Sequence, residues 1–153
     1  MEAEVSETTR RLASFVAEMR YEEVPPAVAR YAKMIVLDTL GAMLAASSPR
    51  YSAGRILAEF ARLQGGEPES TLVGRGTRVS CVSAALANGT LGYYCDVEPH
   101  HPEAILHGAA VVVPTALAVG ERQRSSGREF LSAVILGAEV GARVSLAIGP
   151  TAL

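Results

Sequence analysis

The chain has 153 residues, of which 49% are hydrophobic and 20% are charged, and its formal net charge is −2 at pH 7. This composition is typical of a globular chain rather than a disordered one, and the length fits a single domain. Acidic and basic residues are mixed along the sequence, so the chain lacks the basic footprint of a nucleic-acid-binding protein. We therefore expect no nucleic-acid partner.

The N-terminal segment 1–4 is acidic and lacks the basic and apolar regions of a secretion signal. The longest apolar run, 109–119, is too short to cross a bilayer. The two cysteines, Cys81 and Cys95, have no CxxC spacing and do not suggest a disulfide framework. The sequence therefore predicts a cytoplasmic protein with no membrane partner.

Helical spacing dominates the first half of the chain. Leu12, Phe15, Val16 and Met19 follow the i, i+3, i+4, i+7 pattern, which predicts a helix near 7–20 with one buried face. A pair of prolines then interrupts the pattern and can begin a second helix.

The second predicted helix covers 26–46 and is apolar around much of its circumference, which is typical of a central, buried helix. A third helix is predicted over 51–64, closed by the glycine pair that follows it. Its large apolar residues are expected to face the core: Ile56, Leu57, Phe60 and Leu63.

The second half of the chain begins with a short extended piece at 71–73. Helices are then predicted from a cap at Ser80 to about residue 94, and over 109–122. The last helix, 127–148, opens with a capping box in which Ser126 is the N-cap and a glutamate stands at N3.

These elements predict an all-α fold. About six helices form an orthogonal or bundle-like array with little or no sheet. The whole chain, 1–153, is expected to be one helical domain. Because its last two helices are apolar on more than one face, we expect a partner, either another subunit or a further segment.

All three histidines, His100, His101 and His107, lie within eight residues, just after Asp96 and Glu98. Histidine is the side chain whose proton exchange falls near neutral pH, and a nearby carboxylate can fix its tautomer. This segment is therefore the best candidate for proton-transfer chemistry, with Asp96 orienting one histidine. The alternative is structural: His101 is an exposed loop residue and His107 caps the next helix.

The same side chains could serve as ligands for Zn, Mn or Fe. Their spacing matches no named metal signature, so a metal site is the weaker alternative. We expect no metal and no cofactor.

A glycine-rich segment at 74–78 carries two arginines, Arg75 and Arg78. Tight turns at glycine expose backbone N–H groups, so this segment could bind an anion such as a substrate carboxylate. It is neither a P-loop nor a dinucleotide fingerprint, because the required lysine and third glycine are missing. The alternative is a simple surface turn.

Three segments together resemble the MmgE/PrpD family: 72–80, 84–91 and the loop 96–107. The segments 12–16, 36–41 and 126–130 are also similar, so the resemblance covers nearly the whole chain. The family includes 2-methylcitrate dehydratase, cis-aconitate decarboxylase and iminodisuccinate epimerase. The resemblance implies the N-terminal part of the family's helical domain, with the C-terminal remainder and an α/β lid absent.

The family loop reads like H-x-x-D-[FY]-D-D-T-H-P…H-P. Asp96 matches its first aspartate and His107 its later histidine, so the resemblance implies an active-site role for Asp96 and proton transfer by His107. His101 matches the earlier histidine-proline pair, and His100 joins it in our catalytic set. Glu98 stands in the place of the second acid and, with the two arginines above, is assigned to substrate binding.

The loop also departs from the family pattern. Tyr93 replaces the histidine ahead of the first aspartate, Pro99 replaces the third acid, and Gly108 replaces the proline after the last histidine. These departures leave the identity of the substrate open.

Taken with the resemblance, the sequence predicts a lyase-type subunit, similar to a dehydratase or decarboxylase, that acts on a small polycarboxylate such as 2-methylcitrate. Eliminating water or CO2 from such a substrate requires cations, and this chain has few. We therefore expect it to work as a homo-oligomer, such as a dimer, or with a companion C-terminal subunit. The alternative is a non-catalytic truncated module that binds a partner subunit or a small acid.

Overall fold

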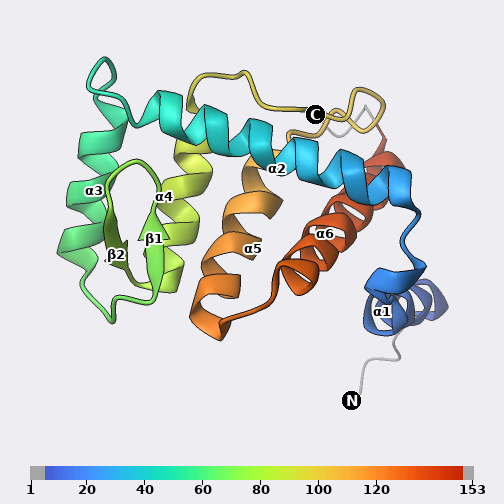
Figure 1. Cartoon of the computed structure of the whole chain (residues 1–153). Helices are drawn as coiled ribbons and strands as arrows, with labels where there is room; N and C mark the ends of the chain where they lie inside the picture. Colours follow the sequence, from blue (N-terminus) through green and yellow to red (C-terminus); the bar gives the residue numbers. More distant parts are fainter. Residues whose placement is uncertain (1–5, 150–153) are drawn as a thin grey trace.

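The structure, a computed structural model, describes residues 6–149, and this part of the chain is predominantly helical, as predicted. Figure 1 shows α2 crossing α4, α5 and α6, so the helices form the orthogonal array expected. The elements in chain order are α1 (Glu7–Glu18), the short 3-10 helix η1 (Tyr21–Glu23), α2 (Pro26–Ala46), α3 (Ala53–Gln64), β1 (Ser70–Leu72), β2 (Thr77–Val79), α4 (Cys81–Tyr94), α5 (Ala109–Gln123) and α6 (Gly127–Ile148).

Three helix starts follow directly from local signals in the sequence. Pro26 occupies the first position of α2, where its missing N–H costs nothing. The Ser80 hydroxyl accepts a hydrogen bond from the backbone N–H of Ser83 and caps α4. Ser126 and Glu129 form the predicted capping box of α6.

The core lies where α2 crosses α4 and α5. Met43, Leu91 and Val113 are fully buried there. Helices α4 and α5 approach closely at Gly89, where an added Cβ would lie 3.2 Å from the carbonyl oxygen of Ala110. This glycine therefore has a packing role inside its helix, because a larger side chain would push the two helices apart.

The prediction that α1 buries one face is wrong. No residue of α1 is buried, and Phe15 and Val16 are 42% and 41% exposed. Figure 1 shows α1 at one end of the helical array, beside the start of α2. Its apolar stripe is uncovered because no described element packs over it.

The predicted inward face of α3 is only partly correct: Leu57 packs against the core, as expected, but other large residues of that face do not. Ile56 and Leu63 are 53% and 67% exposed, whereas Ala53, Gly54 and Ala61 are buried. The helix passes close to the end of α2, so that a Cβ added at Gly54 would lie 2.9 Å from the backbone there. Small residues therefore occupy the buried positions of α3, and the side chains of Ile56 and Leu63 are left at the surface.

Helix α2 is central, as expected, but it is buried on one side alone. Thr39, Met43 and Ala46 are buried, whereas the outward side chains of Met34 and Leu37 are 60% and 73% exposed. An apolar sequence does not distinguish a fully covered helix from one with an uncovered side.

Helix α6 is also apolar and largely uncovered. Among its described residues, Val134 is the one that is buried. By length and composition alone α6 could cross a membrane, a test that core helices of soluble proteins also pass. The longest apolar run, 109–119, lies in α5, but α6 is the helix that is long enough and apolar enough on average. That no membrane partner is needed stays a prediction.

The extended piece becomes a short hairpin in which β1 and β2 pair antiparallel. Buried Asn88 of α4 fixes it: the side-chain oxygen accepts from Val73 N–H at 3.0 Å, and the amide NH2 donates to the Thr71 carbonyl at 2.9 Å. Both backbone groups are satisfied by one side chain, so Asn88 joins the hairpin to the core.

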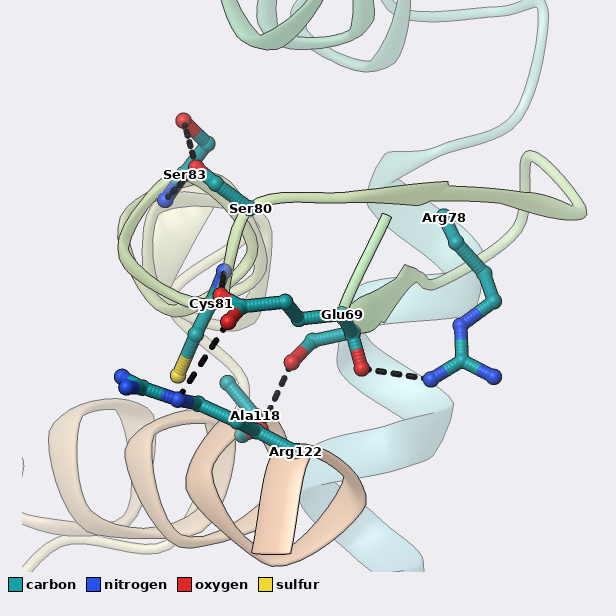
Figure 2. Close-up of polar contacts among 8 residues, drawn as sticks. Glu69, Arg78, Ser80, Cys81, Ser83, Ala118 and Arg122 are labelled. Atoms are coloured by element: carbon teal, nitrogen blue, oxygen red, sulfur yellow. Dashed lines mark hydrogen bonds and ion pairs between the residues drawn. The ribbon is translucent and has the colours of Figure 1, made fainter. Parts of the chain in front are cut away.

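Figure 2 shows three of the polar contacts that Glu69 makes just before the hairpin. One carboxylate oxygen accepts from the Cys81 N–H at 3.1 Å and so caps α4, and the other pairs with Arg122 at 3.3 Å. Its backbone carbonyl accepts a hydrogen bond from Arg78. The two carboxylate oxygens of Glu69 therefore join the start of the hairpin to α4 and α5, and its carbonyl is bound by an arginine of the hairpin itself.

Candidate active site

The histidine segment forms the loop 95–108 between α4 and α5. Asp96 and Ile105 have φ angles of 52° and 48°, so the chain turns through the left-handed region at both places. His101 and Leu106 pair as an antiparallel bridge: His101 N–H donates to Leu106 O at 2.9 Å, and the reverse bond measures 3.3 Å. This bridge folds the loop back on itself.

The next pair outward from the bridge is His100 and His107. Their rings stack with centroids 5.4 Å apart and an interplanar angle of 22°. The bridge therefore explains why two histidines seven positions apart come into contact.

The tip of the loop is tied down by two hydrogen bonds to Ala104. Its N–H donates to Nδ1 of His101 at 3.1 Å, and its carbonyl accepts from the Ser145 hydroxyl of α6 at 2.6 Å. His101 thus has a structural role in closing the loop. Its predicted catalytic role stays a prediction.

His107 pairs most closely with Glu98. Its Nδ1 lies 2.8 Å from Oε1 of Glu98 and 3.9 Å from Oδ1 of Asp96. The Glu98 side chain is 0% exposed, whereas that of Asp96 is 72% exposed. This differs from the expectation that Asp96 orients the histidine and Glu98 binds substrate, because the left-handed turn at Asp96 leaves its carboxylate at the surface.

Glu98 is incompletely satisfied. Its second carboxylate oxygen, Oε2, is buried and has no hydrogen-bond partner in the described chain. A buried carboxylate is costly unless it is paired and hydrogen-bonded, and native proteins leave few such groups unsatisfied. The imidazole of His107 is therefore the main compensation for burying this acid, and the unpaired oxygen distinguishes Glu98 from an ordinary structural carboxylate.

The hydrogen bond to Glu98 assigns the tautomer of His107. With Glu98 ionised, Nδ1 carries the proton and donates it, which leaves Nε2 with a free lone pair. The ring of Tyr93 packs edge-on against this imidazole at 5.1 Å between centroids. The His107 side chain is 37% exposed, so the ring is accessible from solvent while its partner Glu98 is buried.

An apolar groove of about 480 Å³ lies beside the loop, between α2, α5 and α6. His100 and His101 line it together with Tyr31, Val112 and Ile135. His107 and its two acids do not line this groove. The His107–Glu98 pair is therefore separate from the groove, and His100, which stacks on His107 and lines the groove, is in contact with both.

The comparison with known sequences decides the family. The MmgE/PrpD N-terminal domain matches residues 10–152. The chain belongs to the MmgE/PrpD family.

Two curated relatives carry names that state an activity. The chain is 29% identical over 151 residues to the "Cis-aconitate decarboxylase-like protein oryM" of Aspergillus oryzae, covering 92% of this chain and 30% of that protein. It is 25% identical over 150 residues to the "Cis-aconitate decarboxylase" of Aspergillus terreus, covering 94% of this chain and 30% of that protein. The chain thus spans about 30% of the length of these relatives, whose names support a lyase-like family.

Tyr93 gains importance in this MmgE/PrpD chain. It stands where the family pattern usually has histidine, and it contacts His107. Sequence reasoning noted the substitution without giving Tyr93 a role. The signal that could have found it was its place in the motif, one turn before the loop acids.

Arg75 and Arg78 lie elsewhere. Both belong to the β1–β2 hairpin and line a separate groove against α3. The structure does not bring them to the histidine loop, and their assignment to substrate binding there stays a prediction.

The acids and His107 also have the donor set of a metal site, since one ligand atom from each of Asp96, Glu98 and His107 lies within 4.8 Å of the others. Such oxygen and imidazole ligands suit Mn, Fe or Zn. The 2.8 Å separation of Nδ1 and Oε1 is that of a direct hydrogen bond, so a proton occupies the space between these atoms. The expectation that no metal is bound stays a prediction.

Proposed function

We propose that this chain is the helical part of a lyase that acts on a small polycarboxylate. His107 moves a proton at the carbon next to a substrate carboxylate. The observation that carries the proposal is the pairing of a half-exposed imidazole with a fully buried, incompletely satisfied glutamate. Pairs of this kind, a base oriented by a carboxylate, are the working unit of general acid–base catalysis.

The geometry supplies a mechanism. Nε2 of His107 takes the proton from the substrate carbon, and the ring becomes an imidazolium. Glu98 holds Nδ1–H throughout and stabilises the positive charge that develops on the ring. The same imidazolium then returns its proton to the leaving group or to the product carbon.

The substrate carboxylates need cations that this part of the chain does not place at the loop. Among residues 6–149, neither Asp96 nor Glu98 pairs with an arginine or lysine. We therefore propose that a companion C-terminal polypeptide, a further segment or a second copy supplies them. The uncovered apolar sides of α2 and α6 are surfaces where such a partner could pack.

The test is exchange of the substrate C–H with deuterium, followed by NMR. The chain is incubated in D2O with cis-aconitate, citrate or 2-methylcitrate, both alone and mixed with its companion polypeptide. We expect exchange or turnover that falls by about 10²–10⁴-fold in His107→Gln, the range for loss of a general acid–base group. Glu103→Gln, an exposed change in the same loop, is the matched control and should keep the rate. An unchanged rate in His107→Gln would overturn the proposal.

A second candidate function is binding without catalysis. The observation that favours it is the position of His107 outside the apolar groove, together with the exposure of Asp96. A ligand that binds the native state raises apparent stability by mass action. A rise in Tm with citrate-like acids, without any C–H exchange in the presence of the companion, would select this function over the first.

A further inference from the structure

The β1–β2 hairpin and α3 enclose a second groove, of about 870 Å³, that is lined by four arginines. We propose that this groove is a binding site for a small multivalent anion of the phosphate or carboxylate type. The proposal concerns residues that take no part in the proposed proton transfer.

Two walls bring the arginines together. Arg55, Glu59 and Arg62 are spaced by four and three residues along α3, so they lie on one face of the helix. Arg75 and Arg78 come from the hairpin on the other wall. A helix face and the hairpin that follows it in the chain therefore converge on one groove.

The positive charge of the groove is poorly compensated. Glu59 is its one acidic residue, and it is already engaged by Arg62 through contacts of 2.9 and 2.7 Å. That guanidinium holds the pKa of Glu59 below its ordinary value, so the pair stays charged at neutral pH. Within residues 6–149, Arg55 and Arg75 form no ion pair, so two guanidinium groups are available to a ligand.

Arg78 has one partner that orients it. One of its nitrogens donates to the Glu69 carbonyl, as Figure 2 shows, which fixes the side chain while leaving its charge uncompensated. Glu69 itself is held by α4 and α5, so this arginine is attached to a rigid part of the fold. A pre-positioned cation loses less side-chain entropy when it binds.

The side chain of Arg75 is partly buried against α3. Its guanidinium lies so close to Gly54 of α3 that an added Cβ there would overlap it, and its Nε is buried without a hydrogen-bond partner. A buried unsatisfied donor is unfavourable. An anion that accepts from the outer nitrogens of this guanidinium would offset the cost of holding a cation in this position.

The chemistry of the lining selects the ligand class. Guanidinium groups present planar pairs of N–H donors that match the oxygens of phosphate and carboxylate. The groove has no aromatic side chain on which a base could stack, and the chain as a whole is acidic. These features favour a small anion with two or more charges over a nucleic acid.

The experiment is calorimetric titration of the folded chain with inorganic pyrophosphate, citrate and acetate at one ionic strength set with chloride. We expect saturable binding of pyrophosphate or citrate that is about tenfold or more tighter than that of acetate, because more guanidinium contacts can form. The tighter of the two multivalent anions identifies a phosphate or a carboxylate ligand. Absence of saturable binding by both would overturn the proposal.

Variants distinguish binding in the groove from non-specific attraction of anions to the net charge of the protein. We expect Arg55→Gln, an exposed change, to weaken anion binding about threefold. The double variant that also carries Arg75→Gln should weaken it about tenfold or more. Arg11→Gln with Arg20→Gln makes the same change in net charge on exposed residues outside the groove and should have no effect. Equal weakening in this control pair would overturn the proposal.

The outcome is independent of the proposed function. His107→Gln should bind pyrophosphate or citrate in the groove as the unmodified chain does, even where it abolishes proton exchange. If the unmodified chain shows no exchange even when mixed with its companion polypeptide but still binds the anion, the groove proposal stands and the lyase proposal fails.

Discussion

Two glutamates in this molecule are used in opposite ways. Glu69, beside the hairpin, has both carboxylate oxygens engaged, one by the N-terminus of α4 and one by an arginine of α5. Glu98, in the histidine loop, is more deeply buried, and one of its oxygens has no partner. The carboxylate of Glu69 joins elements of the fold. The carboxylate of Glu98 keeps one oxygen free to form a further hydrogen bond, as a group that takes part in a reaction requires.

The difference teaches that burial alone does not identify a functional acid. What distinguishes Glu98 is a single strong contact, to a side chain that can itself exchange a proton. The predictions below test this contrast, beginning with the largest expected effect.

Glu98→Gln should slow proton transfer by about 10³-fold, because the neutral amide can no longer stabilise the imidazolium of His107. It should change the free energy of unfolding little, since removing a buried charge also removes its desolvation cost. Exchange kinetics and urea denaturation measure the two effects. A large loss in the free energy of unfolding with an unchanged exchange rate would show that Glu98, like Glu69, has a structural role.

Asn88→Ala should lower the free energy of unfolding by about 2–4 kcal/mol, because it leaves two hairpin backbone groups, at Thr71 and Val73, without their partner. Urea denaturation monitored by circular dichroism measures the change. Thr90→Ala, an exposed substitution on the same helix, serves as the control and should cost less than about 0.5 kcal/mol.

Glu69→Gln is the counterpart of Glu98→Gln, because it should affect stability and not proton transfer. It should lower the free energy of unfolding by about 1–2 kcal/mol, through loss of charge at the α4 N-terminus and of the ion pair with Arg122. The rate of proton transfer should not change. If this variant loses activity while keeping its stability, the contrast between the two glutamates is wrong.

Ser126→Ala should have the smallest effect, about 1 kcal/mol, as expected for loss of an N-cap. The capping box also predicts a dependence on pH. Hydrogen bonds from Ser126 lower the pKa of Glu129 below its ordinary value of 4.5.

Because the folded pKa of Glu129 is lowered, its contribution is fully present above pH 4.5 and is lost as the pH falls through the lowered value. Denaturation on both sides of this pH measures the loss. Glu129→Gln should lack this component of the pH dependence, since it cannot titrate.

Local signals made much of the fold predictable. Pro26, Ser80 and Ser126 begin their helices where the sequence placed them, because a cap depends on neighbours within a few residues. The buried face of α3 was not predictable in this way. Its apolar pattern has a clear stripe, but the side that faces the core was decided by how closely the end of α2 approaches Gly54.

The sequence predicted which residues gather at the candidate site, but it did not predict which acid pairs with which histidine. The sequence brought the three histidines and two acids together, but it suggested Asp96 as the partner of His107. The backbone turn at Asp96 and the bridge between His101 and Leu106 determine that Glu98 takes this place. Both features depend on a folded loop that residue spacing does not describe.

The hydrogen bond from Ser145 to the loop carbonyl of Ala104 spans 41 positions in the sequence. It makes the last turn of a largely uncovered helix one of the supports for the histidine loop. The position of the histidine loop is thereby linked to the way α6 packs. A change in the packing of α6 should therefore alter the proton transfer proposed for His107, even where no residue of the histidine loop has been changed.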